Sequence, residues 1–163
     1  PGICTLSGDC LFKLYRYTGN NLYLELIGDI AHNSMQYISR DDRPISRQHT
    51  GWVNERVNLS DWEGEGNVGG LFHGNTWAQV SAMLTVAEIP GIYVNPEKHE
   101  LYVFDHVEVS LKGNQMKITN PTKFDANVSI FVDEQGIKPY AQGFMSACPK
   151  VFVKAGTSEI YSF

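Results

Sequence analysis

The pattern of apolar and polar positions changes near residue 90. Before this point, apolar residues recur every three or four positions, which is typical of amphipathic helices. This spacing predicts helices over residues 8–17, 21–38 and 76–88. Gly19 lies between the first two, where a residue in the left-handed conformation commonly ends a helix. We therefore expect these two helices to form an antiparallel hairpin with a very short turn.

After residue 90, apolar and polar residues alternate, which predicts strands with one buried and one solvated face. The predicted strands cover residues 92–95, 100–104, 107–111, 115–119, 126–132, 150–154 and 159–163. Polar turns separate them, as is usual in antiparallel sheets and β-sandwiches. The sequence therefore predicts an α+β fold with two regions, a helical region over residues 1–90 and an antiparallel β-sandwich region over residues 91–163.

Composition excludes some classes of partner. The 163 residues carry a formal net charge of −5 and no cluster of Lys and Arg, which argues against nucleic acid and anionic membranes as partners. No apolar run is long enough for a transmembrane helix, and no signal peptide is visible, so extracytoplasmic and cytoplasmic locations both stay open. The chain begins with Pro1, which indicates processing or excision from a longer protein.

The cysteines and histidines do not indicate a metal or cofactor. Cys4, Cys10 and Cys148 include no CxxC pair, and the five histidines are scattered. A structural zinc site needs four clustered ligands, so none is expected. Free or buried thiols are favoured over a disulfide, although the spacing allows one.

The most informative segment is the acidic loop, residues 51–66, with the sequence GWVNERVNLSDWEGEG. It contains Trp52 and Trp62 together with several carboxylates. Flat aromatic rings can stack on sugar rings, and carboxylates can bind hydroxyls or move protons. The loop therefore favours a carbohydrate site. The alternative is a structural loop, in which the tryptophans fill a helix–sheet junction and the charges pair with one another.

Three segments in this order resemble the C-terminal end of the six-hairpin glycosidases. They read GDCLFKLYRYTGNNLYLELIGDIAHN (8–33), GWVNERVNLSDWEG (51–64) and GNTWAQVSAMLTVAEIPGIYV (74–94). In that family, twelve helices form an (α/α)6 toroid followed by a β-sandwich. The resemblance covers about residues 5–112. It implies that the chain contains the last toroid helices and the sandwich, and that it binds glycans or hydrolyses glycosidic bonds with carboxylates.

The sequence departs from that family in two respects. Three predicted helices cannot close a toroid of twelve, so the chain is expected to be an incomplete fragment, inactive alone. Its uncovered helix face would then bind either the missing N-terminal toroid or a second copy. The beta-L-arabinofuranosidase branch uses a cysteine-ligated zinc and a cysteine nucleophile. Cys10 could match one of its cysteines, but residues 74–76 stand where the cysteine pair would lie, so this chemistry is not expected.

Within this resemblance, we assign Glu55 as the acid/base and Asp61 as its partner carboxylate. Retaining enzymes place the two groups about 5–5.5 Å apart and inverting enzymes roughly 6.5–9.5 Å apart, and the loop allows both. Arg56 would bind a uronic acid carboxylate, or it would form a salt bridge within the loop. The predicted substrate-binding residues are Trp52, Asn54, Arg56, Trp62 and His73.

Three alternatives remain at this stage. In a polysaccharide lyase, His73 or His49 would abstract a proton together with Tyr93 or Asn75. In a non-catalytic glycan-binding module, the tryptophans would bind the sugar and the acids would be structural. In a purely structural domain, the chain would support a neighbouring one.

Overall fold

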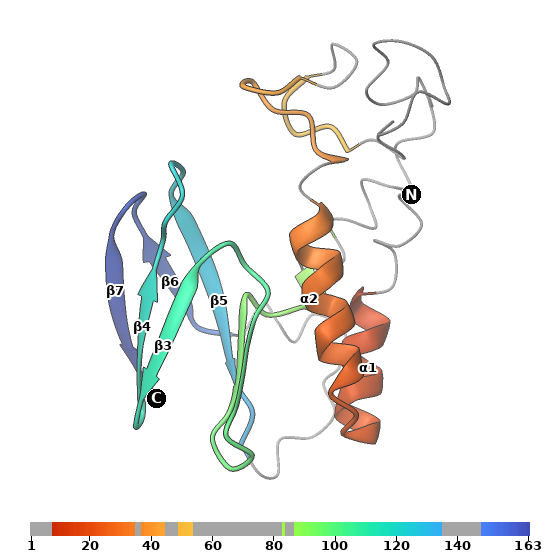
Figure 1. Ribbon diagram of the computed structural model, residues 1–163, viewed down its shortest axis with the longest axis vertical. Helices are drawn as coiled ribbons and strands as arrows, with labels where there is room; N and C mark the ends of the chain where they lie inside the picture. Colours follow the sequence, from red (N-terminus) through yellow and green to blue (C-terminus); the bar gives the residue numbers. More distant parts are fainter. Residues whose placement is uncertain (1–7, 35–36, 45–48, 54–82, 84–86, 135–147) are drawn as a thin grey trace.

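The computed structural model describes residues 8–34, 37–44, 49–53, 83, 87–134 and 148–163 (Figure 1). It begins with the predicted helical hairpin, formed by α1 (Gly8–Thr18) and α2 (Leu22–Ser34). Gly19 has a φ of 69°, and its N–H donates to the Tyr15 carbonyl at 2.7 Å, which closes the end of α1. The Asn20 side chain then accepts from the Leu22 N–H at 3.1 Å and caps α2.

The second helix is shorter than predicted. It ends at Ser34, whereas the apolar spacing predicted helix as far as Ile38. Ile38 instead forms an isolated antiparallel bridge with Val53, and Tyr37 and Val53 are buried in a small core of their own. Tyr37 and Ile38 fit the helical stripe, but contacts with a distant segment decide their conformation. Of the third predicted helix, Met83, Ala87 and Glu88 are helical, and the other residues of 76–88 lie outside the described residues.

The strands follow the predicted alternation closely. They are β1 (Ile92–Asn95), β2 (Glu100–Val103), β3 (Glu108–Lys112), β4 (Gln115–Thr119), β5 (Ala126–Val132), β6 (Lys150–Val153) and β7 (Ser158–Ser162). Within the described residues they form a four-stranded sheet in the order β2-β1-β5-β6 and a three-stranded sheet in the order β3-β4-β7. The described fold is therefore α+β, with two helices followed by two sheets.

One strand pair corrects the prediction of a wholly antiparallel β region. β1 and β5 are parallel, with Ile92 opposite Ile130 and Val94 opposite Val132. After the antiparallel β1–β2 hairpin, the chain crosses to the other sheet, forms the β3–β4 hairpin there, and returns to place β5 beside β1. The four-stranded sheet is therefore mixed, and the three-stranded sheet is antiparallel.

The four-stranded sheet has a different layer on each face (Figure 1). On one face, Ile92 and Val94 of β1 share a core cluster with Met116 and Ile118 of β4, so this core draws on both sheets. On the other face, Tyr93 packs among side chains from the two helices. This second cluster contains Phe12, Tyr15, Leu24, Ile27, Ile89, Tyr93, Phe104 and Phe131. Because successive side chains of β1 point to opposite faces of the sheet, β1 contributes to the core with the helices and to the core with the other sheet.

Gly91 marks the point where the chain enters the sheet. A Cβ at this position would lie 2.9 Å from Val128 Cγ1 and 3.2 Å from the Ser129 carbonyl oxygen. The Gly91 N–H also donates to Ser129 Oγ at 2.9 Å. A side chain is disfavoured here, because its Cβ would overlap the Val128 side chain and crowd the backbone of β5.

No helix among the described residues has the length and apolar character needed to cross a membrane.

Candidate functional site

The structure describes one of the predicted site residues, Trp52. The two predicted catalytic carboxylates, Glu55 and Asp61, lie outside the described residues. The same holds for four of the predicted substrate-binding residues, which are Asn54, Arg56, Trp62 and His73. The site is therefore built from Trp52 and the described residues around it.

Trp52 is held by backbone pairing at the start of the acidic loop. Its carbonyl accepts from the Ser39 N–H at 2.8 Å, and the Ser39 carbonyl accepts from the Gly51 N–H at 2.8 Å. The next residue, Val53, is buried and anchors the segment. The Trp52 side chain itself is 45 % exposed. An indole that is open to solvent and carried on a hydrogen-bonded backbone is suited to stack on a flat ligand.

A tight turn lies beside Trp52. Arg40 and Arg43 exchange two backbone hydrogen bonds of 3.2 and 3.1 Å, which close the turn over Asp41 and Asp42. The Asp41 carboxylate accepts from the Thr50 hydroxyl, which ties the turn to the segment that carries Trp52. The turn and the tryptophan therefore form one local unit.

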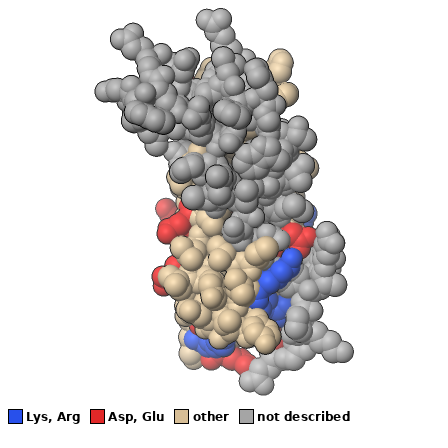
Figure 2. All heavy atoms as spheres, turned by 90° about the vertical axis from the view of Figure 1, so that its right-hand side faces the viewer, with Lys and Arg blue, Asp and Glu red and all other residues tan. Residues whose placement is uncertain are grey.

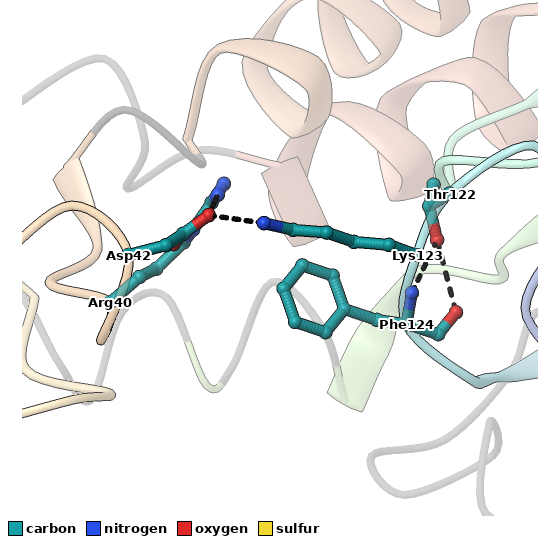
Figure 3. Close-up of polar contacts among 5 residues, drawn as sticks. All are labelled: Arg40, Asp42, Thr122, Lys123 and Phe124. Atoms are coloured by element: carbon teal, nitrogen blue, oxygen red, sulfur yellow. Dashed lines mark hydrogen bonds and ion pairs between the residues drawn. The ribbon is translucent and has the colours of Figure 1, made fainter.

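We call Arg40, Asp42, Lys123 and Phe124 the turn cluster (Figure 3). Arg40 donates two hydrogen bonds to the Asp42 carboxylate, at 2.8 and 2.5 Å, and Lys123 Nζ donates to the same carboxylate at 2.7 Å. The hydrogen bonds from Arg40, and to a lesser extent from Lys123, hold the pKa of Asp42 well below its ordinary value. The same Arg40 bonds to Asp42 raise the pKa of Arg40. Both cations also lie over the Phe124 ring, at 5.7 Å for Arg40 Cζ and 5.3 Å for Lys123 Nζ.

Hydrogen bonds of Asn120 and Thr122 hold the loop that carries Lys123 and Phe124. Asn120 is fully buried, and its amide nitrogen donates to the carbonyl oxygens of Phe124 at 2.7 Å and Val153 at 3.1 Å. The Thr122 hydroxyl donates to Asn120 Oδ1 at 2.7 Å and accepts from the Phe124 N–H at 3.2 Å. The loop backbone is therefore well supported, while the Phe124 ring remains 54 % exposed. A second flat apolar surface thus lies beside the turn.

Sequence reasoning missed a second polar group, which we call the tyrosine network: Tyr15, Tyr93, Glu100 and Asp133. Tyr15 donates to Glu100 Oε2 at 2.6 Å, and Tyr93 donates to Asp133 Oδ2 at 2.8 Å. The two hydroxyl oxygens are 3.1 Å apart. Burial, then the hydrogen bond to Glu100, raises the pKa of Tyr15, and burial is also the largest cause of the raised pKa of Tyr93.

The two tyrosines of the tyrosine network are buried. Tyr15 is almost fully buried and Tyr93 is fully buried between α1 and the sheet. Arg16 adds an ion pair to Asp133 at 3.2 Å, and Asn21 donates to Glu100 Oε1 at 3.0 Å. The network therefore positions the helical hairpin on the sheet. Tyr93 is thus buried within this network, and the lyase alternative that names it stays a prediction. The hydrogen-bonded partners in the tyrosine network lie tens of residues apart in the chain, so no local sequence pattern reveals their contacts.

No metal centre is found in the part of the chain that the structure describes, where no three His, Cys, Asp or Glu side chains cluster. Cys10 is an exposed free thiol, Cys148 is partly buried, and Cys4 lies outside the described residues. Burial raises the pKa of the Cys148 thiol, which makes it less reactive than an exposed one.

Comparison with known proteins adds no relative: no family model, curated protein or solved structure matches the chain. The resemblance to the six-hairpin glycosidases therefore rests on the three sequence segments quoted above. The chemistry of the residues around Trp52 is the remaining guide to function.

Proposed function

We propose that the chain is the C-terminal part of a carbohydrate-active protein that binds a glycan against Trp52. In this proposal Glu55 and Asp61 hydrolyse the glycosidic bond when the toroid is complete. The observation that carries the proposal is the half-exposed Trp52 indole, held by backbone pairing three residues before Glu55. Rigid aromatic surfaces beside polar groups are characteristic of sites that bind sugars through their apolar faces and hydroxyls.

The fold supports the same proposal. The core cluster on one face of the four-stranded sheet includes Met116 and Ile118 of the other sheet. We propose that the two sheets form the C-terminal β-sandwich of a six-hairpin glycosidase. The α1–α2 hairpin, packed on the opposite face, would be a late hairpin of the toroid.

The turn cluster would border the glycan. Phe124 contacts Arg40, and the neighbouring Ser39 pairs with the backbone of Trp52. The second exposed ring is therefore connected to the tryptophan through a short chain of contacts. Arg40 donors and Asp42 oxygens are the kinds of group that bind sugar hydroxyls. The two exposed rings, with Arg40 and Asp42 beside them, support a site with two aromatic surfaces and a charged edge.

A non-catalytic glycan-binding module is the second candidate. The exposure of Trp52 and Phe124 favours it, because both rings are partly open to solvent without any contribution from Glu55. In that case, the carboxylates of the acidic loop would be structural.

Binding to a panel of mono- and disaccharides that includes glucuronate and galacturonate tests the proposal. We expect a ligand for the wild-type chain and loss of binding in Trp52→Ala. Loss of binding in Glu55→Gln and Asp61→Asn, with the fold retained, favours the hydrolase. Loss confined to Trp52→Ala and Trp62→Ala favours the binding module. Binding that survives Trp52→Ala contradicts both.

A further inference from the structure

Two histidines from distant segments of the chain meet near the end of α2. His32 lies in the last turn of α2, and His106 lies in the connection between β2 and β3. Their ring centres are 5.5 Å apart, and the ring planes are inclined by 50°. Both residues are exposed. Neutral imidazole is the commonest metal ligand in proteins, so two imidazoles within reach of one ion form a candidate metal site.

The separation of the two rings suits one shared ion. Zinc lies about 2.0–2.1 Å from a ligating imidazole nitrogen, which places it roughly 3.2 Å from the centre of that ring. Two imidazoles on one tetrahedral ion therefore have ring centres about 5.2 Å apart. The 5.5 Å between His32 and His106 is close to this value. Because both side chains are exposed, small rotations can turn one nitrogen of each ring toward the same ion.

The backbone on both sides of the pair is held in place. The His106 N–H donates to Asp105 Oδ1 at 2.7 Å, and the Asp105 N–H donates to the Gly91 carbonyl at 3.1 Å. On the helix, Ala31 packs against the core that the hairpin shares with the sheet, directly before His32. Metal binding would therefore order little backbone, and ligands held in advance bind a metal more tightly.

The pair lies at the end of α2 away from the tyrosine network. At the other end, Asn21 donates to Glu100 at the start of β2. The helix rises by about 16 Å from Asn21 to His32, and an extended chain from Glu100 to His106 covers roughly 20 Å. The α2 and β2 segments therefore meet near both of their ends. A metal ion at the histidine pair would fix the end that leads to the segment carrying Trp52.

Imidazole nitrogens, rather than a general negative field, would select the ion. Figure 2 views the side of the helical hairpin and shows a described surface that is largely uncharged, with acidic and basic groups together at its margins. No third His, Cys, Asp or Glu among the described residues completes a cluster with the two histidines. Ca²⁺ and Mg²⁺ prefer oxygen ligands, whereas Zn²⁺, Ni²⁺ and Cu²⁺ are well suited to imidazole.

We propose that His32 and His106 together bind one divalent transition-metal ion, and that this ion fixes the end of α2 to the connection between β2 and β3. Water would hold the remaining coordination positions, so a chelator should remove the ion. The site is separate from Trp52 and does not depend on glycan binding.

Zinc titration of the chelator-treated 163-residue chain, followed by calorimetry and by NMR of the imidazole signals, tests the proposal. We expect one zinc ion per chain. His32→Gln and His106→Gln should each weaken zinc binding by about ten-fold or more. The double variant should lose little beyond either single variant, because one ion needs both ligands. His49→Gln and His99→Gln are matched controls that remove other exposed histidines, and both should leave the affinity unchanged.

A second readout is the melting temperature. Zinc should raise it in the wild-type chain but not in His106→Gln, because an ion that binds only the folded chain stabilises it. Calcium in place of zinc should produce neither binding nor a shift. Zinc binding that survives in the double variant, or that the control substitutions weaken equally, overturns the proposal. A wild-type chain that binds no zinc, or binds calcium equally well, overturns it too.

Discussion

Tyr15 of α1 and Tyr93 of β1 meet edge to face, with ring centroids 5.4 Å apart and hydroxyl oxygens 3.1 Å apart. The Tyr15 hydroxyl donates across to Glu100 of β2, and the Tyr93 hydroxyl donates to Asp133, which follows β5. One pair of rings thus combines apolar packing with a continuous polar contact between the helical layer and the sheet. The helical hairpin is attached to the sheet at this point.

The first prediction concerns the Tyr93 hydroxyl. Tyr93→Phe keeps the ring in the core but removes the donor to Asp133, leaving a carboxylate oxygen in a half-buried site without that bond. We expect the free energy of unfolding to fall by about 1–2 kcal/mol in urea titrations. Tyr17→Phe removes the hydroxyl of an exposed tyrosine in the same hairpin and should change stability by less than about 0.5 kcal/mol. Equal effects of the two substitutions would show that the network contributes nothing specific.

The second prediction compares two glycines. Gly91→Ala forces a methyl group against Val128 and the Ser129 carbonyl, so the free energy of unfolding should fall by about 1–3 kcal/mol. Gly28 lies inside α2 with nothing within 4 Å of an added Cβ, and Gly28→Ala should stabilise the chain by roughly 0.5–1 kcal/mol. Thermal unfolding of both variants measures this. A tolerated Gly91→Ala would mean that β1 and β5 are not as close as described.

The third prediction concerns pH. The folded pKa of Asp42 lies below its unfolded value of about 3.9, so its charged contacts stabilise the turn cluster at and above that pH. This contribution is lost as pH falls from about 4 through the lower folded pKa. Because Asp42 is exposed, salt should weaken the effect. NMR titration of the carboxyl group should show the depressed pKa, and Lys123→Ala should raise it. An ordinary pKa for Asp42 in the wild-type chain would contradict the geometry of the turn cluster.

Local sequence signals predicted the elements of the fold but not their longer-range partners. Alternation around Tyr93 located β1, and Gly19 located the turn between the helices, because both signals act within a few residues. The parallel pairing of β1 with β5 and the end of α2 before Tyr37 depend on segments that are distant in the chain. The tyrosine network has the same origin. Chemical pattern can suggest such contacts only after the topology is known.

As with the fold, the sequence predicted part of the candidate site but not the contacts between distant segments. The composition of the acidic loop predicted Trp52 as a surface for ligands, and this stays a prediction, although the side chain is 45 % exposed. The contact of Phe124 with Arg40 was not predictable, because Phe124 lies in a loop between strands and reaches Arg40 only in the folded chain. Glu55 and Asp61 remain predictions, since both lie outside the described residues.

The most direct test of glycan binding at Trp52 is the melting temperature of three chains with and without sugar. The three are wild type, Trp52→Ala and Phe152→Ala, the last removing an aromatic residue of β6 with a comparable exposed fraction. At a hundred times its dissociation constant, a bound glycan should stabilise the wild type by about 2.7 kcal/mol, a shift of several degrees. We predict this shift in wild type and Phe152→Ala and its loss in Trp52→Ala. A shift that persists in Trp52→Ala, or no shift with any glycan, would contradict the proposed function.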